Sequence, residues 1–137
     1  MTRLPTVDHL RDVLTGAPDE VSAAYLFGSV ARGTPSPSSD VDLGVLLRGA
    51  ARTLEEQLFD YQDRLQGAIG CPVHIIVLNN APADLVHRVL RDGRLLLERD
   101  RAARIAFEVR ARNMYFDLQP VLTAYRQRVL ARAAERR

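Results

Sequence analysis

The spacing of hydrophobic positions changes repeatedly along the chain, and each stretch predicts one element. Apolar residues at intervals of three and four predict helices over residues 5–18, 54–69 and 82–92. Short apolar runs that end at Gly, Pro or Asn predict strands over residues 21–27, 40–47 and 73–78, with 95–97 as a short strand or a packed extension. This alternation predicts an α/β (α+β) domain whose small mixed sheet is packed by helices.

The C-terminal stretch, residues 101–137, has helical spacing throughout and predicts one long helix or two. Pro120 lies inside it and is expected to kink or split the helix, because proline lacks the backbone N–H that a helix interior needs. We therefore divide the chain into residues 1–100, a compact domain, and residues 101–137, a helical extension of the same domain. Tyr115, Phe116 and Tyr125 are expected to pack in a helical core, with base stacking as the alternative.

Composition places the chain among ordinary one-domain proteins. It has 137 residues, of which 47% are hydrophobic and 26% charged. No apolar run approaches the ~20 residues that cross a bilayer, and the N-terminal residues have no apolar signal region. We expect a cytoplasmic protein without a membrane segment. The single Cys71 cannot form an internal disulfide, and we interpret it as a small buried hydrophobe.

Charge is distributed unevenly between the two parts. Residues 1–100 carry ten Arg and fourteen acidic residues, whereas residues 101–137 carry nine Arg and three acidic residues. Three interpretations of the Arg-rich extension are open: a solvated helix face, a docking surface for an acidic partner, or a surface that binds RNA. There is no Lys in the chain, which excludes P-loop and Schiff-base chemistry.

Candidate phosphate ligands follow the first predicted strand. This strand ends at Gly28, where a side chain would block the close approach of a ligand. Ser29 then offers a hydroxyl and a backbone N–H at what we expect to be a helix N-terminus, an end that attracts phosphate. Arg32 can add a bidentate phosphate contact, although a salt bridge on the first helical turn is an equal alternative.

Two carboxylates begin the second predicted strand. Asp40 and Asp42 are separated by one residue, so their side chains point to the same face at a spacing of about 6–7 Å. Left bare, the two charges would repel each other. A divalent cation removes this repulsion, and Mg²⁺ prefers one or two carboxylates together with substrate phosphates. A solvated acidic edge after a Ser/Pro loop is the alternative, but the position after the Gly28 turn favours a nucleotide and metal site.

The string from Gly28-Ser29 through Arg32 to Asp40-Val41-Asp42 resembles the signature of the DNA polymerase β-like nucleotidyltransferase superfamily. The short length, residues 73–93 and residues 112–126 resemble its minimal nucleotidyltransferase (MNT) branch. The resemblance implies the polymerase β-like fold. It also implies an antitoxin that is paired with a HEPN-domain RNase toxin and transfers AMP from ATP to a tyrosine of that toxin.

The same resemblance assigns roles to individual residues. Gly28 and Ser29 would hold the β- and γ-phosphates of ATP, with Arg32 as a further phosphate contact. Asp40 and Asp42 would bind two Mg²⁺ ions while a hydroxyl attacks the α-phosphorus in line and pyrophosphate leaves.

One position departs from the superfamily pattern. A third carboxylate is expected on a later strand, at the position of His74, but residues 73–80 contain no acid. His74 could ligate a metal or act as general base. It could instead be a drifted residue in a dead site, or have a purely structural role. Losing a general base costs about 10²–10⁴-fold in rate.

Four functional hypotheses follow. The first is the Mg²⁺-dependent AMP transferase that modifies a HEPN toxin. The second is a catalytically weak or silent MNT-like antitoxin that neutralises its toxin by binding alone. A transferase for small molecules is the third, although 137 residues leave little room for an acceptor domain. The fourth is an adaptor that binds nucleic acid directly through the Arg-rich extension.

Overall fold

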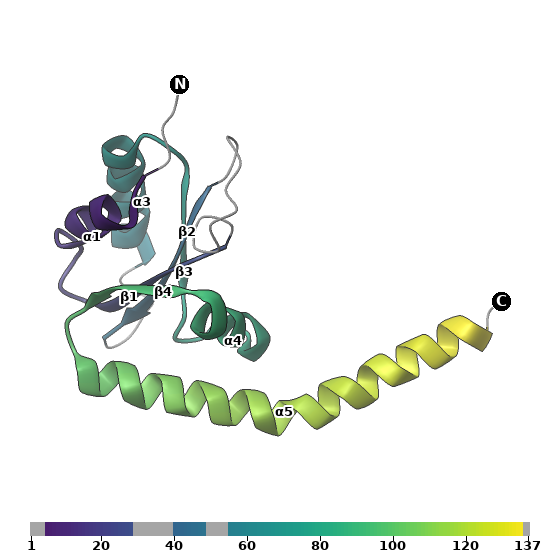
Figure 1. Cartoon of the computed structure of the whole chain (residues 1–137). Coiled ribbons are helices and arrows are strands. Elements are labelled where there is room, and N and C mark those ends of the chain that lie inside the picture. The colour runs from purple at the N-terminus through teal and green to yellow at the C-terminus, as the bar shows by residue number, and fades with distance from the viewer. Residues whose placement is uncertain (1–4, 29–39, 49–54, 136–137) are drawn as a thin grey trace.

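The chain forms one four-stranded sheet with helices on both faces (Figure 1). The computed structural model describes residues 5–28, 40–48 and 55–135. In chain order the elements are α1 (Val7–Leu14), β1 (Val21–Phe27), β2 (Val41–Leu47), α3 (Glu55–Ile69), β3 (Val73–Val77), α4 (Ala83–Asp92), β4 (Arg94–Glu98) and α5 (Arg101–Glu135). The predicted mixed α/β architecture with a C-terminal helical extension is confirmed, and residues 95–97 lie in a strand.

The sheet has the order β3-β2-β1-β4, with β1 and β2 in the middle. β1 pairs antiparallel with both β2 and β4, whereas β2 and β3 run parallel. This connectivity brings the end of β1 and the starts of β2 and β3 to the same edge of the sheet. The predicted Gly28 turn and the predicted acidic pair therefore share one edge.

Alternation along the strands produces two apolar layers. On one face, α1 and α3 cover a core that includes Leu26, Leu43 and Leu65. On the other face, α4 and the start of α5 cover Tyr25, Leu46 and Leu78 (Figure 1). Asp42 lies an even number of residues from Leu46 on β2, so its side chain points to the α4–α5 face.

Helix ends follow local chemistry. The Thr6 hydroxyl caps α1 by accepting a hydrogen bond from the backbone N–H of His9 (3.2 Å). Gly93 follows α4 but has φ −78°, so it does not use the left-handed conformation common after helices. A Cβ atom there would overlap the carbonyl oxygen of Val89 and press on that of Leu26. Only glycine therefore fits at position 93, because β4 begins close to the end of α4 and leaves no room for a side chain.

A polar network attaches the start of α5 to the sheet. The Tyr25 hydroxyl donates a hydrogen bond to Glu108 (2.7 Å), and Arg104 forms ion pairs with Glu98 and Glu108. Burial, followed by the adjacent Glu108, raises the pKa of Tyr25. The phenol therefore stays protonated and keeps donating to Glu108 at neutral pH.

The second half of α5 leaves the body of the molecule. α5 remains one helix through Pro120 and bends about halfway along its length (Figure 1). Tyr115 stacks on His87 of α4, but Phe116 and Tyr125 are 59% and 65% exposed. Core packing was thus a wrong prediction for Phe116 and Tyr125, because α4 faces the side of α5 that carries Tyr115 and leaves these two side chains largely exposed. No helix within the described ranges combines the length and apolar character needed to cross a membrane.

Candidate active site

The site begins where β1 ends. Antiparallel pairing places Phe27 opposite Asp42, so Gly28 lies beside the Asp42 side chain. Gly28 has φ +79°, a left-handed conformation that disfavours every residue with a Cβ atom. A Cβ atom at this position would also overlap Oδ2 of Asp42. The turn and the carboxylate are therefore in direct contact, and only glycine fits between them.

Asp40, Asp42 and His74 lie together on the adjoining strands. Parallel pairing places His74 beside Asp42, and the His74 imidazole donates a hydrogen bond from Nε2 to Oδ2 of Asp40 (2.8 Å). Both side chains of this pair are accessible, with His74 60% and Asp40 39% exposed. Two carboxylates and one imidazole thus converge at one sheet edge and remain open to a ligand.

The electrostatics of Asp42 show how closely these groups interact. Burial raises the pKa of Asp42 above its ordinary value; the neighbouring His74 lowers this pKa, and the neighbouring Asp40 raises it. The ionised carboxylate is therefore held in an unfavourable environment unless a cation offsets its charge.

The donor set suits Mg²⁺ only when phosphate oxygens complete it. Among the described residues, no group of three or more His, Cys, Asp or Glu side chains is arranged to hold a metal ion. Asp40 and Asp42 supply two carboxylates, which is the protein share that Mg²⁺ commonly takes when the rest of its shell is phosphate and water. Ser29 and Arg32, the other predicted phosphate ligands, lie outside the described residues.

A cavity of about 240 Å³ adjoins the Gly28 turn. It is lined by Phe27, Gly28, Leu85, Arg88, Arg91 and Asp92. Arg91 forms a two-pronged ion pair with Asp92 (both contacts 2.9 Å), so Arg88 is the more available cation. Sequence reasoning missed both arginines. Their spacing of three residues on an amphipathic helix was the available signal, since it places them on one face.

A strand that ends in a glycine turn, held against a second strand that begins with two acids, is the arrangement expected from the resemblance to the nucleotidyltransferases. The chain belongs to the polymerase beta, nucleotidyltransferase family, whose model matches residues 9–102. The family resemblance stated from the sequence is thereby confirmed.

Individual relatives agree with this assignment. The chain is 32% identical over 111 residues to the protein adenylyltransferase MntA of Shewanella oneidensis, covering 80% of this chain and 77% of that protein. Its fold matches the crystal structure of a toxin–antitoxin with AMP-PNP (TM-score 0.77, 24% identity, 92% of this chain and 99% of that one). It also matches a chain of the tri-AMPylated Shewanella oneidensis HEPN toxin in complex with MNT antitoxin (TM-score 0.70, 22% identity, 90% of this chain and 95% of that one).

Proposed function

We propose that this chain is an antitoxin with protein adenylyltransferase activity. In the cytoplasm it would transfer AMP from ATP to a tyrosine of a HEPN-type RNase toxin. The tri-AMPylated state of the HEPN toxin in the matched complex supports more than one transfer per toxin. The observation that carries the proposal is the contact between the Gly28 turn and the Asp42 carboxylate, with Asp40 on the same face. The 32% identity to a protein adenylyltransferase supports the choice of reaction.

The metal is the first requirement of this reaction. Asp40 and Asp42 would hold two Mg²⁺ ions, whose charge offsets that of the triphosphate and of the departing pyrophosphate. The raised pKa of Asp42 fits this role, because a carboxylate in an unfavourable environment gains from a neighbouring cation. Gly28 leaves the turn open to the phosphates, and Arg88 lies across the adjoining cavity as a further counter-charge.

The proposed transfer replaces one P–O bond of the α-phosphorus with another. The phenolic oxygen of the toxin tyrosine attacks the α-phosphorus of ATP and forms the new P–O bond. The bond from that phosphorus to the oxygen bridging to the β-phosphate breaks, and pyrophosphate leaves with the electron pair. The phenolic proton passes to a base, for which His74 is the candidate by position, since it lies beside Asp42 and is 60% exposed.

One observation favours the second candidate function, an antitoxin that acts by binding alone. His74 occupies Asp40 with a 2.8 Å hydrogen bond, so a metal ion would have to compete with the imidazole for that carboxylate. Such competition would weaken metal binding and slow the transfer without affecting the contact with the toxin.

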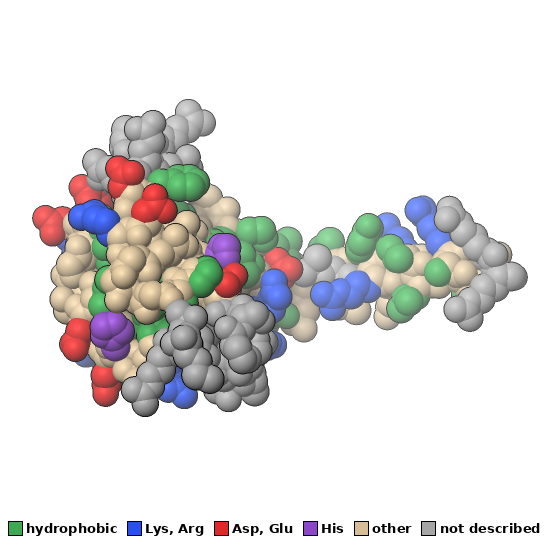
Figure 2. Space-filling view, turned by 90° about the horizontal axis from the view of Figure 1, so that it is seen from above, with side chains coloured by type: hydrophobic (Ala, Val, Ile, Leu, Met, Phe, Trp, Pro, Cys, Tyr) green, Lys and Arg blue, Asp and Glu red, His purple; other side chains and the backbone are tan. Residues whose placement is uncertain are grey.

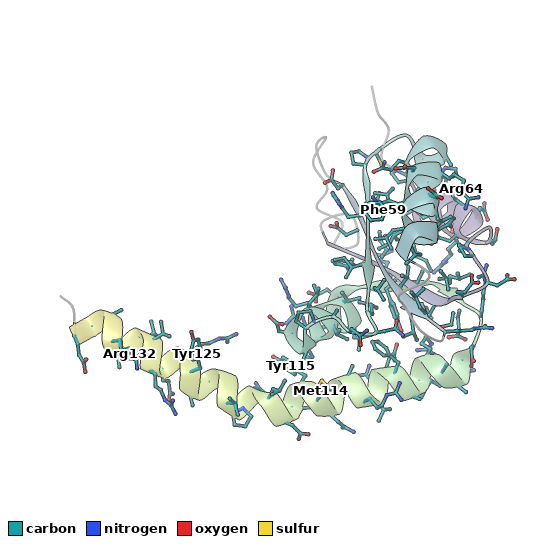
Figure 3. All side chains as sticks on the ribbon, turned by 180° about the vertical axis from the view of Figure 1, so that it is seen from behind. Phe59, Arg64, Met114, Tyr115, Tyr125 and Arg132 are labelled. Carbon is teal, nitrogen blue, oxygen red and sulfur yellow. The ribbon has the colours of Figure 1, made fainter. Side chains whose placement is uncertain are left out.

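The second half of α5, residues 121–135, is called the free half below and is the proposed contact surface for the toxin. It carries Val121, Tyr125, Val129 and Leu130 exposed, at 47% or more, among arginines (Figures 2 and 3). Apolar and aromatic side chains with Arg at the margin are typical of protein interfaces. This surface would hold the toxin while its tyrosine reaches the sheet edge.

The test uses the purified chain, a HEPN toxin and ATP labelled at the α-phosphate, with Mg²⁺ present. The double substitution Asp40→Asn and Asp42→Asn should abolish labelling of the toxin and restore toxicity in cells. Asp60→Asn with Asp63→Asn is the matched control, since both acids are exposed on α3. Labelling that persists in the first variant refutes the proposed site. Protection from toxicity without any labelling by the wild-type chain establishes neutralisation by binding.

A further inference from the structure

A cavity lies between α4 and α5, outside the proposed metal site. It has a volume of about 420 Å³, within the range that small-molecule sites occupy. Its lining comes from one face of each helix: Asp84, His87, Arg88 and Arg91 from α4, and Tyr115, Gln119, Thr123 and Arg126 from α5. Arg88 and Arg91 also line the cavity beside Gly28, so the two cavities share these residues.

The charges around this cavity favour an anion. Three arginines line it against one carboxylate, that of Asp84. Arg91 is engaged by Asp92, whereas Arg88 and Arg126 have no ion pair within the described part of the chain. Guanidinium groups that face a cavity without a partner are suited to phosphate, which they bind through paired N–H donors.

An aromatic wall accompanies these charges. The rings of His87 and Tyr115 stack with centroids 3.7 Å apart and planes 4° apart, which joins α4 to α5 inside the cavity lining. Figure 3 shows Tyr115 where α5 passes the body of the molecule. Flat ring systems of this kind bind nucleobases by stacking, and Gln119 and Thr123 add groups that can hydrogen-bond a base edge.

We propose that the cavity between α4 and α5 binds an AMP group that has already been transferred to the toxin. Arg88 and Arg126 hold its phosphate, and the His87–Tyr115 pair faces its adenine. This inference rests on the proposed function and deepens it. A second transfer requires that the first AMP leave the sheet edge before the next ATP binds, and the shared arginines connect that edge to the second cavity.

The first arm of the test counts AMP groups on the toxin by intact mass spectrometry. Arg126→Gln removes a lining cation, whereas Arg128→Gln removes an exposed cation of the same helix that does not line the cavity. With the toxin saturated by the chain, so that a change in toxin affinity does not affect the rate, we expect Arg126→Gln to leave the first transfer within twofold of wild type and to slow later transfers at least tenfold. Arg128→Gln should change neither. Equal product distributions in the two variants, or a wild-type product with a single AMP, overturn the inference.

The second arm needs no activity. Titration of the full chain with 5′-AMP, followed by ¹H–¹⁵N NMR, should shift signals of His87, Tyr115 and Thr123, and Arg126→Gln should weaken this binding at least fivefold. Shifts confined to Gly28 and Asp42 would refute the second cavity but leave the proposed function intact. A toxin that receives no AMP from the wild-type chain would refute the proposed function, and the titration would still decide whether the cavity binds AMP. If the cavity instead serves an acidic toxin segment, Arg126→Gln will weaken toxin binding while 5′-AMP causes no shift.

Discussion

Oδ2 of Asp42 occupies the space that a Cβ atom on Gly28 would fill. The pairing of Phe27 with Asp42 fixes this contact, so the turn and the carboxylate cannot move independently. A change at Gly28 must therefore act on the position of the carboxylate, even though glycine has no side chain to contribute.

We predict that Gly28→Ala lowers the rate of AMP transfer at least ~100-fold, because a displacement of about 1 Å at a reacting centre has that effect. It should also cost about 1–2 kcal/mol in the free energy of unfolding, since alanine is strained at φ +79°. Gly70→Ala is the matched control, because Gly70 has φ +82° but nothing within 4 Å of its hypothetical Cβ atom. Urea denaturation should show a similar loss in the free energy of unfolding for both variants, whereas only Gly28→Ala should lose AMP-transfer activity. Equal transfer by the two would contradict the structural role of the contact.

Asp42 offers a test of stability against pH. Burial raises its pKa in the folded state above the ordinary value of 3.8, so the folded chain holds this proton more tightly than the unfolded chain does. The resulting stabilisation exists below the ordinary pKa and is lost as the pH rises through the raised pKa. At neutral pH, Asp42→Asn should therefore raise the Tm without metal by about 2–4 °C.

The accompanying measurements separate this effect from a general change in stability. The Tm advantage of Asp42→Asn should vanish below about pH 4. Mg²⁺ with an ATP analogue should raise the Tm of the wild-type chain but not the Tm of Asp42→Asn. Asp63→Asn, on the exposed face of α3, should leave the Tm unchanged at every pH. A destabilised Asp42→Asn variant at neutral pH would show that the carboxylate contributes to the fold rather than to a ligand.

The sequence predicts the sheet, most helices and the acidic pair, because each depends on local periodicity. Alternation on β2 suffices to place Asp40 and Asp42 on one face. The hydrogen bond from His74 to Asp40 depends on the parallel register of β2 and β3, which no local pattern specifies. Likewise, Arg88 lines the same cavity as Gly28 only because α4 packs across the sheet.

His74 is expected to limit metal binding through its hydrogen bond to Asp40. Replacing it with a third carboxylate, His74→Asp, should lower the Mg²⁺ concentration at half-maximal transfer about 3–10-fold, because ligand charge tunes affinity for hard cations. His74→Asn, which is polar but uncharged, is the control. Its Mg²⁺ concentration at half-maximal transfer should fall between those of the wild-type chain and His74→Asp. The measurement is labelling of the toxin against Mg²⁺ concentration. The rate at saturating Mg²⁺ tests the separate role of His74 as the base that accepts the phenolic proton: His74→Asn should lose 10²-fold or more if the histidine is that base, and should keep the wild-type rate if it only competes with the metal.

The free half of α5 yields the last prediction, on the contact with the toxin. Tyr125 is 65% exposed on this helix, and Phe59 is 70% exposed on α3, on the other face of the sheet (Figure 3). Tyr125→Asp should weaken the complex with the HEPN toxin about 30-fold, which corresponds to a hot spot of ~2 kcal/mol. Phe59→Asp makes a comparable change from an aromatic to an acid and should stay within twofold of wild type. Both variants should keep the wild-type Tm, because neither side chain is buried, and calorimetric titration with the toxin gives the two affinities. A larger loss for Phe59→Asp would place the toxin against α3 instead, and the free half of α5 would then need another explanation for its apolar surface.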